Sequence, residues 1–304
     1  MADILDGKRI RDEILRECAP RVEALKAHKR APGLAVVLAG NHAASEIYVR
    51  NKVKACAELG MYSEKLTPPE SVTTAEMLEI VDRLNAREDI DGVLVQLPLP
   101  KQVDTQQVLL RVAAEKDVDG FHPLNLGYLM TNRPGPRPCT PSGVMQLLKR
   151  YGIAVAGRNA VVVGRSDIVG KPMAMLLLHE NATVTICHSR TADLAAVCRT
   201  ADILIVAMGR PAFITEDFIK PGAVVVDVGI NRVTDRTVAE RIFGPSSAEL
   251  ASFDQKGGLV VGDVHPLHVR EKASAYTPVP GGVGPLTIAM LMVNTIEAAE
   301  RRLR

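Results

Sequence analysis

In the first half of the chain, short apolar runs alternate with segments whose apolar residues recur at helical spacing. The runs are bounded by turn signals, such as Gly40-Asn41 and Leu97-Pro-Leu-Pro100, which is typical of buried strands. Strands are predicted at residues 34–39, 61–66 and 90–96, with helices between them at 43–59 and 73–85. Thr73 and Glu76 have the spacing of a capping box. This alternation predicts a parallel sheet covered by helices.

A proline-rich segment at residues 131–141 predicts an extended connector between two domains. Thr140 and Pro141 suit the N-cap and first position of a helix that runs to about Tyr151. Further strands are expected at 159–163, 183–187, 202–207, 223–228 and 259–262, and helices at 170–179, 191–199, 215–219 and 284–304. The fold class predicted is therefore two α/β domains, the second a Rossmann-like, doubly wound parallel sheet. The last helix is expected to return to the first domain, which gives domains of 1–139 plus 284–304 and of 140–283.

Composition narrows the class of protein. The 304 residues suffice for two domains, and 37 basic against 35 acidic residues argue against a partner such as nucleic acid or a membrane surface. No apolar run is long enough for a membrane helix, and the first residues do not resemble a signal peptide. The five cysteines are scattered without a C-x-x-C pair, which predicts reduced thiols in the cytoplasm and no structural zinc site. His265-Pro-Leu-His268 is interpreted as a loop rather than a metal-ligand pair.

The segment from Asn159 to Pro172 has the pattern of a strand, a tight turn and a helix start. Gly164 permits the turn and Gly170 a close helix–strand contact, and the backbone N–H groups of the turn are expected to face a pyrophosphate. The match to G-x-G-x-x-G is incomplete, because Ser166 replaces the middle glycine and Val169 shifts the last one. A plain strand–turn–helix packing device is the alternative interpretation.

The end of the next strand bears on the choice of dinucleotide. NAD-preferring folds place a carboxylate there to bind the ribose 2′-hydroxyl, whereas this chain has His188-Ser-Arg-Thr191. Arg190 and Arg165 are suited to pair with a 2′-phosphate, and Ser189 to donate to it. The pattern therefore favours NADP over NAD. The alternative is that Ser189 and Arg190 only cap the next helix and face solvent.

Ser45, Tyr48 and Lys52 stand at positions i, i+3 and i+7, and therefore share one helix face. A phenol and an ammonium group on one face can bind and polarise a ligand. The alternative is a solvated charge run of Arg50, Lys52 and Lys54 with Tyr48 as a packing residue. Short-chain dehydrogenases also use Tyr-x-x-x-Lys, but their pair follows the glycine-rich loop, whereas here it precedes the loop.

Six motifs, taken together, indicate a resemblance to a known family of enzymes. The chain closely resembles the methylenetetrahydrofolate dehydrogenase–cyclohydrolase family from Leu5-Asp-Gly-Lys8 to its final helix. The motifs are Tyr48-Val-x-x-Lys52, Gly92-Val-Leu-Val-Gln-Leu-Pro-Leu-Pro100, Glu115-Lys-Asp-Val-Asp-Gly-Phe121, Pro138-Cys-Thr-Pro141, Gly164-Arg-Ser-x-x-Val-Gly170 and Thr277-Pro-Val-Pro-Gly-Gly-Val-Gly-Pro-Leu-Thr287. Each motif alone is weak, but the combination is specific.

The resemblance implies a role for each matching residue. Lys52 is similar to the family's catalytic lysine, Gln96 to the residue that hydrogen-bonds it, and Tyr48 to the ring that stacks on the aminobenzoate. Asp119 is similar to the carboxylate that holds the pterin, with Asp117 as its rival. Further implied substrate-binding residues are Ser45, Pro280, Gly281 and Gly282; implied cofactor-binding residues are Gly164, Arg165, Ser166, Val169, Gly170, His188, Ser189, Arg190, Thr191 and Ile230.

The resemblance also implies an architecture and an activity. Two α/β domains linked by two long helices would flank a cleft, with Gly281–Gly284 as a flexible loop over it, and the protein would be a homodimer formed through the cofactor domains. The activity implied is NADP-dependent oxidation of 5,10-methylene-tetrahydrofolate, followed by hydrolysis of the methenyl product to 10-formyl-tetrahydrofolate. The alternatives are a dehydrogenase without cyclohydrolase activity and a non-enzymatic dinucleotide sensor. Residues 234–258 form a longer loop than the family has, and the chain leaves no room for a formate–tetrahydrofolate ligase domain.

Overall fold

The computed structural model describes residues 2–28, 30–40 and 43–303. These residues form two compact units. The three-stranded unit comprises Arg11–Cys139 and Thr287–Arg304, and the six-stranded unit comprises Met1–Ile10 and Thr140–Leu286. Two long helices, α1 (Gly7–His28) and α12 (Val283–Arg301), each contain a boundary between the units.

The three-stranded unit has the alternating order that the sequence predicted. Its elements are β2 (Gly33–Val37), α2 (Ala43–Leu59), β3 (Tyr62–Leu66), α3 (Thr74–Ala86), β4 (Gly92–Val95), α4 (Thr105–Arg111) and α5 (Pro123–Met130). The strands are parallel in the order β3-β2-β4. The capping box of Thr73 and Glu76 is confirmed at the start of α3. Gly40 of the predicted turn has a φ of 73°, and Asn41 lies outside the described residues.

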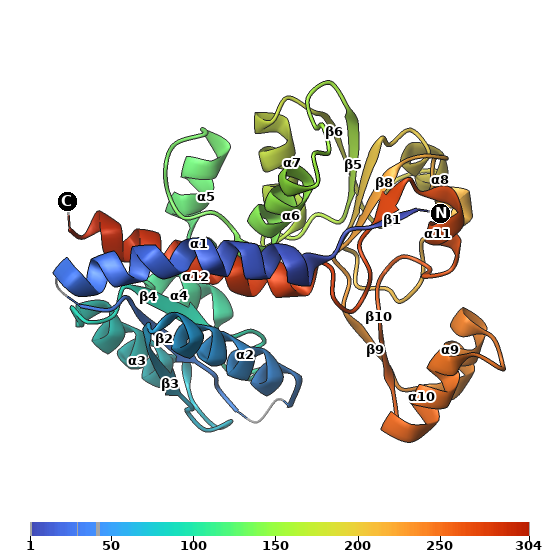
Figure 1. Cartoon of the computed structure of the whole chain (residues 1–304). Coiled ribbons are helices and arrows are strands. Elements are labelled where there is room, and N and C mark those ends of the chain that lie inside the picture. Colours follow the sequence, from blue (N-terminus) through green and yellow to red (C-terminus); the bar gives the residue numbers. More distant parts are fainter. Residues whose placement is uncertain (1, 29, 41–42, 304) are drawn as a thin grey trace. The chain divides into compact units, whose positions relative to one another are not determined.

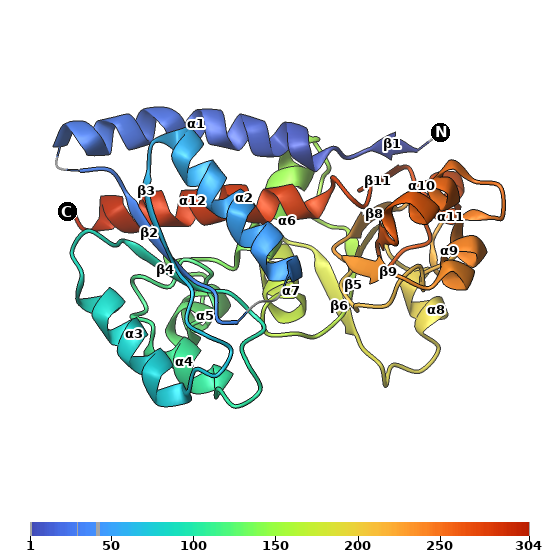
Figure 2. The same ribbon diagram turned by 90° about the horizontal axis from the view of Figure 1, so that it is seen from below.

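Both faces of this sheet are covered, which explains why β2 and β4 are continuously apolar. Met77 and Val81 of α3 and Val108 of α4 pack on one face, and Figure 2 shows these two helices together along that side of the strands. On α2, the Cys56 thiol lies 3.5 Å from the Met292 sulfur of α12. The sheet therefore holds rigid strand ends from which side chains can project.

The six-stranded unit is a doubly wound parallel sheet. Its strands are β1 (Asp3–Ile4), β5 (Asn159–Val163), β6 (Thr183–Cys187), β7 (Ile203–Val206), β8 (Val224–Asp227) and β11 (Ala275–Tyr276). They lie in the order β1-β11-β8-β7-β5-β6, and every pair is parallel. The chain winds outward in opposite directions from β5, so the switch point lies between β5 and β7. Ligands of such sheets bind at the carboxyl ends of the strands at this point.

Helices cover both faces of the six-stranded sheet (Figure 1). They are α6 (Cys139–Arg150), α7 (Gly170–His179), α8 (Leu194–Cys198) and α11 (His268–Lys272), with a 3₁₀ turn, η1, at Glu216–Phe218. Leu148 and Met173 pack with Val162 in one cluster, while Cys198 and Val269 pack in the other. The strands at residues 159–163 and 183–187 and the helix at 170–179 have the predicted bounds.

Local differences from the prediction occur at helix ends and at β1. Helix α6 begins at Cys139, so Thr140 lies inside the helix rather than at its N-cap. The helix expected at residues 191–199 is confined to α8, because Asp193, not Thr191, is the N-cap. Residues 1–10, which the expected domain bounds assign to the first domain, lie with the six-stranded unit, since β1 pairs with β11.

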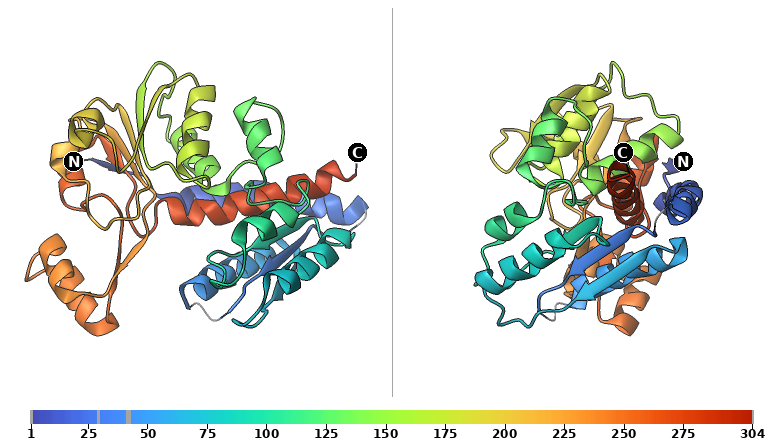
Figure 3. Two further views of the ribbon diagram at one scale, coloured as in Figure 1. Left: turned by 180° about the vertical axis from the view of Figure 1, so that it is seen from behind. Right: turned by 90° about the vertical axis from the view of Figure 1, so that its left-hand side faces the viewer.

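The largest difference is the segment after β8. Residues 259–261 form β10, which pairs antiparallel with β9 (Asn231–Val233) in a separate ribbon and does not join the main sheet. The expected loop at 234–258 contains α9 (Arg236–Phe243) and α10 (Ala248–Lys256), which stand at the end of the ribbon (Figure 3). The two helices bury Ile242, Leu250 and Phe253 in a small core that also includes Val233 and Val261 of the ribbon. This segment is therefore a folded helical pair, not a loop.

Candidate active site

One face of α2 carries the predicted folate-binding residues. Ser45 and Lys52 are buried, at 4% and 8% exposed, and Tyr48 is half-buried. Arg50 and Lys54, in contrast, are exposed. The alternative of a solvated charge run is therefore wrong for Lys52, whose ammonium group is turned away from the exposed face of the helix.

Lys52 has a specific partner at the end of β4. Its Nζ donates a hydrogen bond of 3.0 Å to Oε1 of Gln96. The amide nitrogen of Gln96 donates to the Leu97 carbonyl at 2.8 Å, and its backbone N–H to the Val37 carbonyl at 2.8 Å. The bond to Leu97 orients the side-chain amide of Gln96 so that its oxygen faces Lys52, and the bond to Val37 holds the backbone of Gln96. The ammonium retains two further N–H donors for a ligand.

The structure distinguishes Asp117 from its rival, Asp119. The buried carboxylate of Asp117 accepts hydrogen bonds from the backbone N–H groups of Gly120 (3.1 Å) and His122 (2.7 Å) and from the side chain of Asn125 (2.9 Å). The Asp117 carboxylate is therefore used to hold the turn that follows it. In the part of the chain that the structure describes, no hydrogen bond or ion pair involves the carboxylate of Asp119.

Asp119 is half-buried and chemically poised. Desolvation raises its pKa from 3.8 to about 6; the charge of Lys52 opposes this rise, and that of Asp117 adds to it. At neutral pH the group is ionised, with its acceptor oxygens unused by the described residues. Such a carboxylate is suited to bind N–H donors of a ligand. The interaction with Lys52 brings the predicted lysine and carboxylate into one site.

Tyr48 lies one turn before Lys52 on the same helix face. Burial raises the pKa of its phenol above the ordinary value of 10.0, so the ring stays neutral at physiological pH. A neutral, half-buried aromatic ring offers a flat apolar surface and a hydroxyl donor. It is suited to stack on an aromatic group of a ligand.

The turn after β5 lies at the switch point of the six-stranded sheet. Gly164 has a φ of 138°, and a Cβ there would overlap the Ala207 carbonyl oxygen at the end of β7. A Cβ on Gly170 would likewise overlap the Gly164 carbonyl oxygen. Only glycine permits this close approach of helix α7 to the turn. These two residues are therefore fixed by packing as well as by any ligand.

Ser166 determines which N–H groups of this turn remain available. Its hydroxyl accepts from the backbone N–H groups of Val169 (3.2 Å) and Gly170 (3.3 Å) and so caps α7. The backbone N–H groups of Arg165 and Asp167 make no such bond to another described residue, and both residues are exposed. The helix terminus is thus partly satisfied internally, and an anion would be held chiefly by the preceding turn.

The turn after β6 presents basic and hydroxyl groups. The backbone N–H of His188 donates to the Thr191 hydroxyl at 2.8 Å, and that of Arg190 to the His188 ring at 3.1 Å. Ser189 and Arg190 are exposed beyond this turn. No carboxylate follows β6 in residues 188–191, which suits a phosphate rather than a bare ribose hydroxyl.

The glycine segment before α12 is anchored rather than free. The backbone N–H of Gly7 donates to the Gly281 carbonyl at 3.0 Å, and that of Gly282 to the Pro278 carbonyl at 2.8 Å. Helix α12 already begins at Val283, so Gly284, expected in a flexible loop, is helical. The exposed side chain of Ile230 lies beside Gly284.

Two buried aspartates of the six-stranded unit, Asp263 and Asp227, were not predicted from the sequence. Asp263 accepts hydrogen bonds from three successive backbone N–H groups, those of Met208, Gly209 and Arg210, at 2.7–2.9 Å. Asp227 accepts from the N–H groups of residues 229, 263 and 264, each at 2.9 Å, and burial raises its pKa to about 7. Together they tie the loops at the carboxyl edge to one another. A carboxylate ending an otherwise apolar strand, Val224-Val-Val-Asp227, was the signal that could have revealed Asp227.

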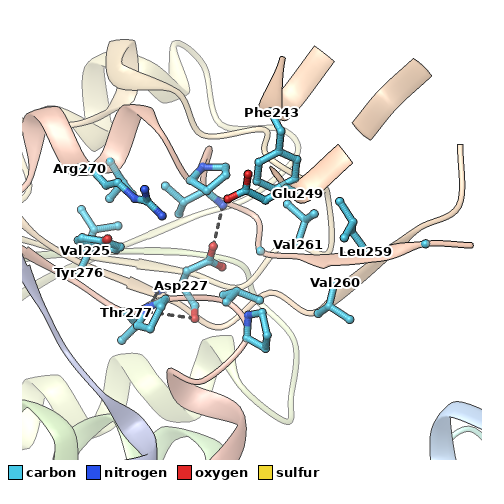
Figure 4. Close-up of a pocket in the computed structure, with 18 of the residues that line it drawn as sticks. Val225, Asp227, Phe243, Glu249, Leu259, Val260, Val261, Arg270, Tyr276 and Thr277 are labelled. Carbon is cyan, nitrogen blue, oxygen red and sulfur yellow. Dashed lines mark hydrogen bonds between the residues drawn. The ribbon is translucent and has the colours of Figure 1, made fainter. Parts of the chain in front are cut away.

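A cavity of about 440 Å³ lies next to Asp227 (Figure 4). Phe243 and Glu249 of the helical pair line one side of it, and Arg270 and Tyr276 line another. Of the predicted site residues, only Pro280 lines it. The cavity is therefore separate from the glycine turn that follows β5.

Residues 265–267 lie in a turn before α11, as expected, and only His268 is helical. The rings of His265 and His268 stack with centroids 3.8 Å apart, and His268 begins α11 and contacts the Glu216 carboxylate. Across residues 2–28, 30–40 and 43–303, no cluster of three or more His, Cys, Asp or Glu side chains is arranged to hold a metal ion. Nor does any helix in those ranges have the length and apolar character needed to cross a membrane.

Comparison with known proteins adds to this geometry. Residues 5–119 match the model of the tetrahydrofolate dehydrogenase/cyclohydrolase catalytic domain, and residues 138–303 match that of its NAD(P)-binding domain. The chain is 66% identical to the bifunctional protein FolD of Solibacter usitatus, over 99% of each chain. It is 62% identical to that of Koribacter versatilis, over 99% of this chain and 98% of the relative.

Two solved structures resemble the whole chain. The methylenetetrahydrofolate dehydrogenase/cyclohydrolase FolD of Campylobacter jejuni superposes with a TM-score of 0.90 at 42% identity, covering 99% of this chain and 100% of the other. The corresponding Trypanosoma brucei enzyme, complexed with NADP cofactor and inhibitor, has a TM-score of 0.89 at 38% identity, covering 100% and 99%. Both of the units described above are thus present in these relatives.

Proposed function

Because the chain belongs to the tetrahydrofolate dehydrogenase/cyclohydrolase family, we propose that its folate chemistry takes place beside Lys52. The enzyme is bifunctional. It oxidises 5,10-methylene-tetrahydrofolate with NADP to the 5,10-methenyl form, and hydrolyses that product to 10-formyl-tetrahydrofolate. The observation that carries the assignment of the site is the hydrogen bond from Lys52 to Gln96, with the available carboxylate of Asp119 in the same unit.

Binding of the folate is assigned to three side chains. Asp119, ionised at neutral pH, accepts hydrogen bonds from the N–H groups of the pterin, a role supported by its lack of a partner among the described residues. The ring of Tyr48 stacks on the aminobenzoate. Ser45, on the same face of α2, adds a polar contact. Pro280, Gly281 and Gly282 complete the proposed substrate-binding set.

Lys52 supports the hydrolytic step. A water oxygen attacks the carbon of the methenyl bridge and loses one proton, which is released and leaves a neutral carbinol. The carbinol hydroxyl then loses its remaining proton as the C=O double bond forms, and the bond from that carbon to N5 breaks as N5 takes up a proton. Lys52 is proposed to orient the water and to mediate the proton transfer, and Gln96 to hold the lysine in place. NADP⁺, when bound, would supply the hydride acceptor for the preceding oxidation.

The dinucleotide is assigned to the carboxyl edge of the six-stranded sheet. The turn containing Arg165 supplies backbone N–H groups for the pyrophosphate, and Arg190 with Ser189 binds the 2′-phosphate. The free donors of this turn and the basic end of β6 support this assignment. The full proposed set is Gly164, Arg165, Ser166, Val169, Gly170, His188, Ser189, Arg190, Thr191 and Ile230.

The division of labour follows from these assignments. We propose that residues 11–139 and 287–304 form the folate-binding catalytic domain and that residues 1–10 and 140–286 form the NADP-binding domain, in place of the expected bounds of 1–139 plus 284–304 and of 140–283. We further propose a cytoplasmic homodimer associated through the cofactor domains, in line with the family resemblance and the scattered free cysteines. Sedimentation equilibrium of the purified chain tests the dimer: a single species of twice the chain mass is expected, and a monomer at micromolar concentration contradicts it.

A direct assay tests the activity. The purified protein is mixed with 5,10-methylene-tetrahydrofolate and NADP⁺, and the absorbance of NADPH is followed together with that of the methenyl intermediate. NADPH formation with little methenyl accumulation is expected of the bifunctional enzyme. Stoichiometric accumulation of the methenyl form would instead indicate a dehydrogenase without cyclohydrolase activity.

A further inference from the structure

Asn294 of helix α12 lies in the three-stranded unit, where its side chain contacts backbone next to Asp119. Its side chain is 4% exposed. The side-chain nitrogen donates to the carbonyl of Val118 at 2.8 Å and to that of Arg137 at 2.9 Å. An amide nitrogen has two N–H groups, so both are used by these two carbonyls. Neither contact involves the neighbouring residues of Asn294 on its own helix.

Each carbonyl group is related to a neighbour of Asp119 in the sequence: one belongs to the residue before Asp119, and the other to a peptide that packs on the residue after it. Val118 directly precedes Asp119. Gly120, which follows it, has a φ of 76°, and a Cβ there would lie 2.5 Å from the Arg137 carbonyl carbon and 2.6 Å from the Pro138 nitrogen. The Arg137–Pro138 peptide therefore packs directly on Gly120. One side-chain nitrogen thus holds the peptide before Asp119 and the peptide against which the residue after Asp119 packs.

Cys139 reinforces this arrangement. It is 2% exposed, and its thiol donates to the same Val118 carbonyl at 3.2 Å while lying 3.5 Å from the Asn294 nitrogen. Burial and the charge of Asp119 raise the pKa of the Cys139 thiol, so it remains an S–H donor. The Val118 carbonyl therefore accepts hydrogen bonds from two buried groups, the Asn294 amide of α12 and the Cys139 thiol at the start of α6.

We propose that Asn294, with Cys139, is a positioning residue that fixes the Asp119 carboxylate for folate. Asp119 makes no hydrogen bond or ion pair of its own within the described residues, so its place depends on the backbone that carries it. A displacement of about 1 Å at a substrate-binding group can cost on the order of 10²-fold in rate. The inference rests on the proposed role of Asp119 in folate binding.

The test compares Asn294→Ala with a matched control, Thr295→Val. Thr295 is the next residue on α12 and is fully buried, but among the described residues its hydroxyl bonds only to Leu291 of the same helix, at 2.8 Å. Cyclohydrolase kcat and KM for methenyl-tetrahydrofolate are measured for both, with NADP⁺ affinity and melting temperature. Asn294→Ala should lower kcat/KM by roughly 10- to 10²-fold, mainly through KM, and leave NADP⁺ affinity unchanged. A kcat/KM within about twofold of the Thr295→Val value would overturn the proposal.

A second comparison separates positioning from general destabilisation. In an Asp119→Asn background, Asn294→Ala should add little further loss, because the group that it positions has already been altered. An equal loss in both backgrounds would contradict the proposal. If Asp119→Asn itself binds folate normally, the proposed role of Asp119 fails, whatever Asn294→Ala does. Should Asn294→Ala not fold, Cys139→Ala takes its place: a smaller loss of the same kind, restored in Cys139→Ser, is expected, and no loss would overturn the proposal.

Discussion

The Nζ of Lys52 and the Oε1 of Gln96 are joined by a 3.0 Å hydrogen bond between a helix and the end of a neighbouring strand. Because the Gln96 amide nitrogen is held by the Leu97 carbonyl, the amide cannot turn without losing a second bond. The Lys52 ammonium group is therefore held by this hydrogen bond, while its other two N–H groups remain available to a ligand. This relationship underlies the predictions for the hydrolytic step.

Replacing Gln96 by leucine should release Lys52 while keeping a side chain of similar size. A hydrogen bond to a charged group contributes about 1.5–3 kcal/mol, so the cyclohydrolase kcat should fall by roughly 10- to 10²-fold. Gln107→Leu is the matched control, because Gln107 is an exposed glutamine of the same unit whose side chain bonds only to Asp104 in the part of the chain that the structure describes. Steady-state kinetics on both variants check this, and equal kcat values would contradict a positioning role for Gln96.

Asp119 should make folate binding depend on pH. Its pKa of about 6 means that the carboxylate is lost as pH falls below 6, so the KM for folate should rise by up to about tenfold per pH unit there. Asp119→Asn should remove this inflection along with most of the affinity. A KM that stays flat between pH 7.5 and about 5 in the wild type would exclude a carboxylate with this pKa from binding.

The same shift predicts an effect on stability. The folded-state pKa of Asp119 is raised above 3.8, so its contribution to stability is fully present below pH 3.8 and is lost as pH rises through about 6. At pH 7 Asp119→Asn should therefore increase the free energy of unfolding. Asp117→Asn should decrease it, because that carboxylate accepts three hydrogen bonds. Urea unfolding of both variants tests this contrast, and a change of the same sign in both would refute it.

Arg190→Ala should weaken NADP⁺ binding selectively. A charge-assisted contact with the 2′-phosphate contributes about 1.5–3 kcal/mol, so the Kd for NADP⁺ should rise by roughly 10- to 10²-fold while that for NAD⁺ changes little. Arg158→Ala is the control, since Arg158 is exposed next to the amino end of β5, at the opposite edge of the sheet. Calorimetric titration with both dinucleotides distinguishes the outcomes; an equal loss for both would indicate a disturbed fold.

Local signals made much of the fold predictable. Thr73 and Glu76 identified a helix start because a capping box depends only on residues three apart. The bounds of β5 and α7 followed from a continuous apolar run and from the glycines at the turn, and those of β6 from its β-branched residues Thr183-Val-Thr-Ile186. The helices α9 and α10 were not predicted, although Asp235 and Ser247 cap them, because residues 234–258 were interpreted only as a long loop.

Long-range contacts could not be read from the sequence. Lys52 and Gln96 were paired only through the family resemblance, since 44 residues separate them. No pattern links Asn294 to Val118 across 176 residues, and the choice between Asp117 and Asp119 depended on which carboxylate the surrounding N–H groups occupy. The pairing of β10 with β9 rather than with the main sheet likewise depends on tertiary structure.

The most direct measurement is of both activities in one preparation of Lys52→Met. Methionine fills a similar volume without the ammonium group, so the cyclohydrolase rate should fall by about 10²- to 10⁴-fold if Lys52 mediates proton transfer. The dehydrogenase rate should fall less, because hydride transfer needs no proton acceptor on the protein, and methenyl-tetrahydrofolate should accumulate during turnover. A wild-type cyclohydrolase rate in Lys52→Met, without methenyl accumulation, would contradict the assignment of the hydrolytic step to this lysine.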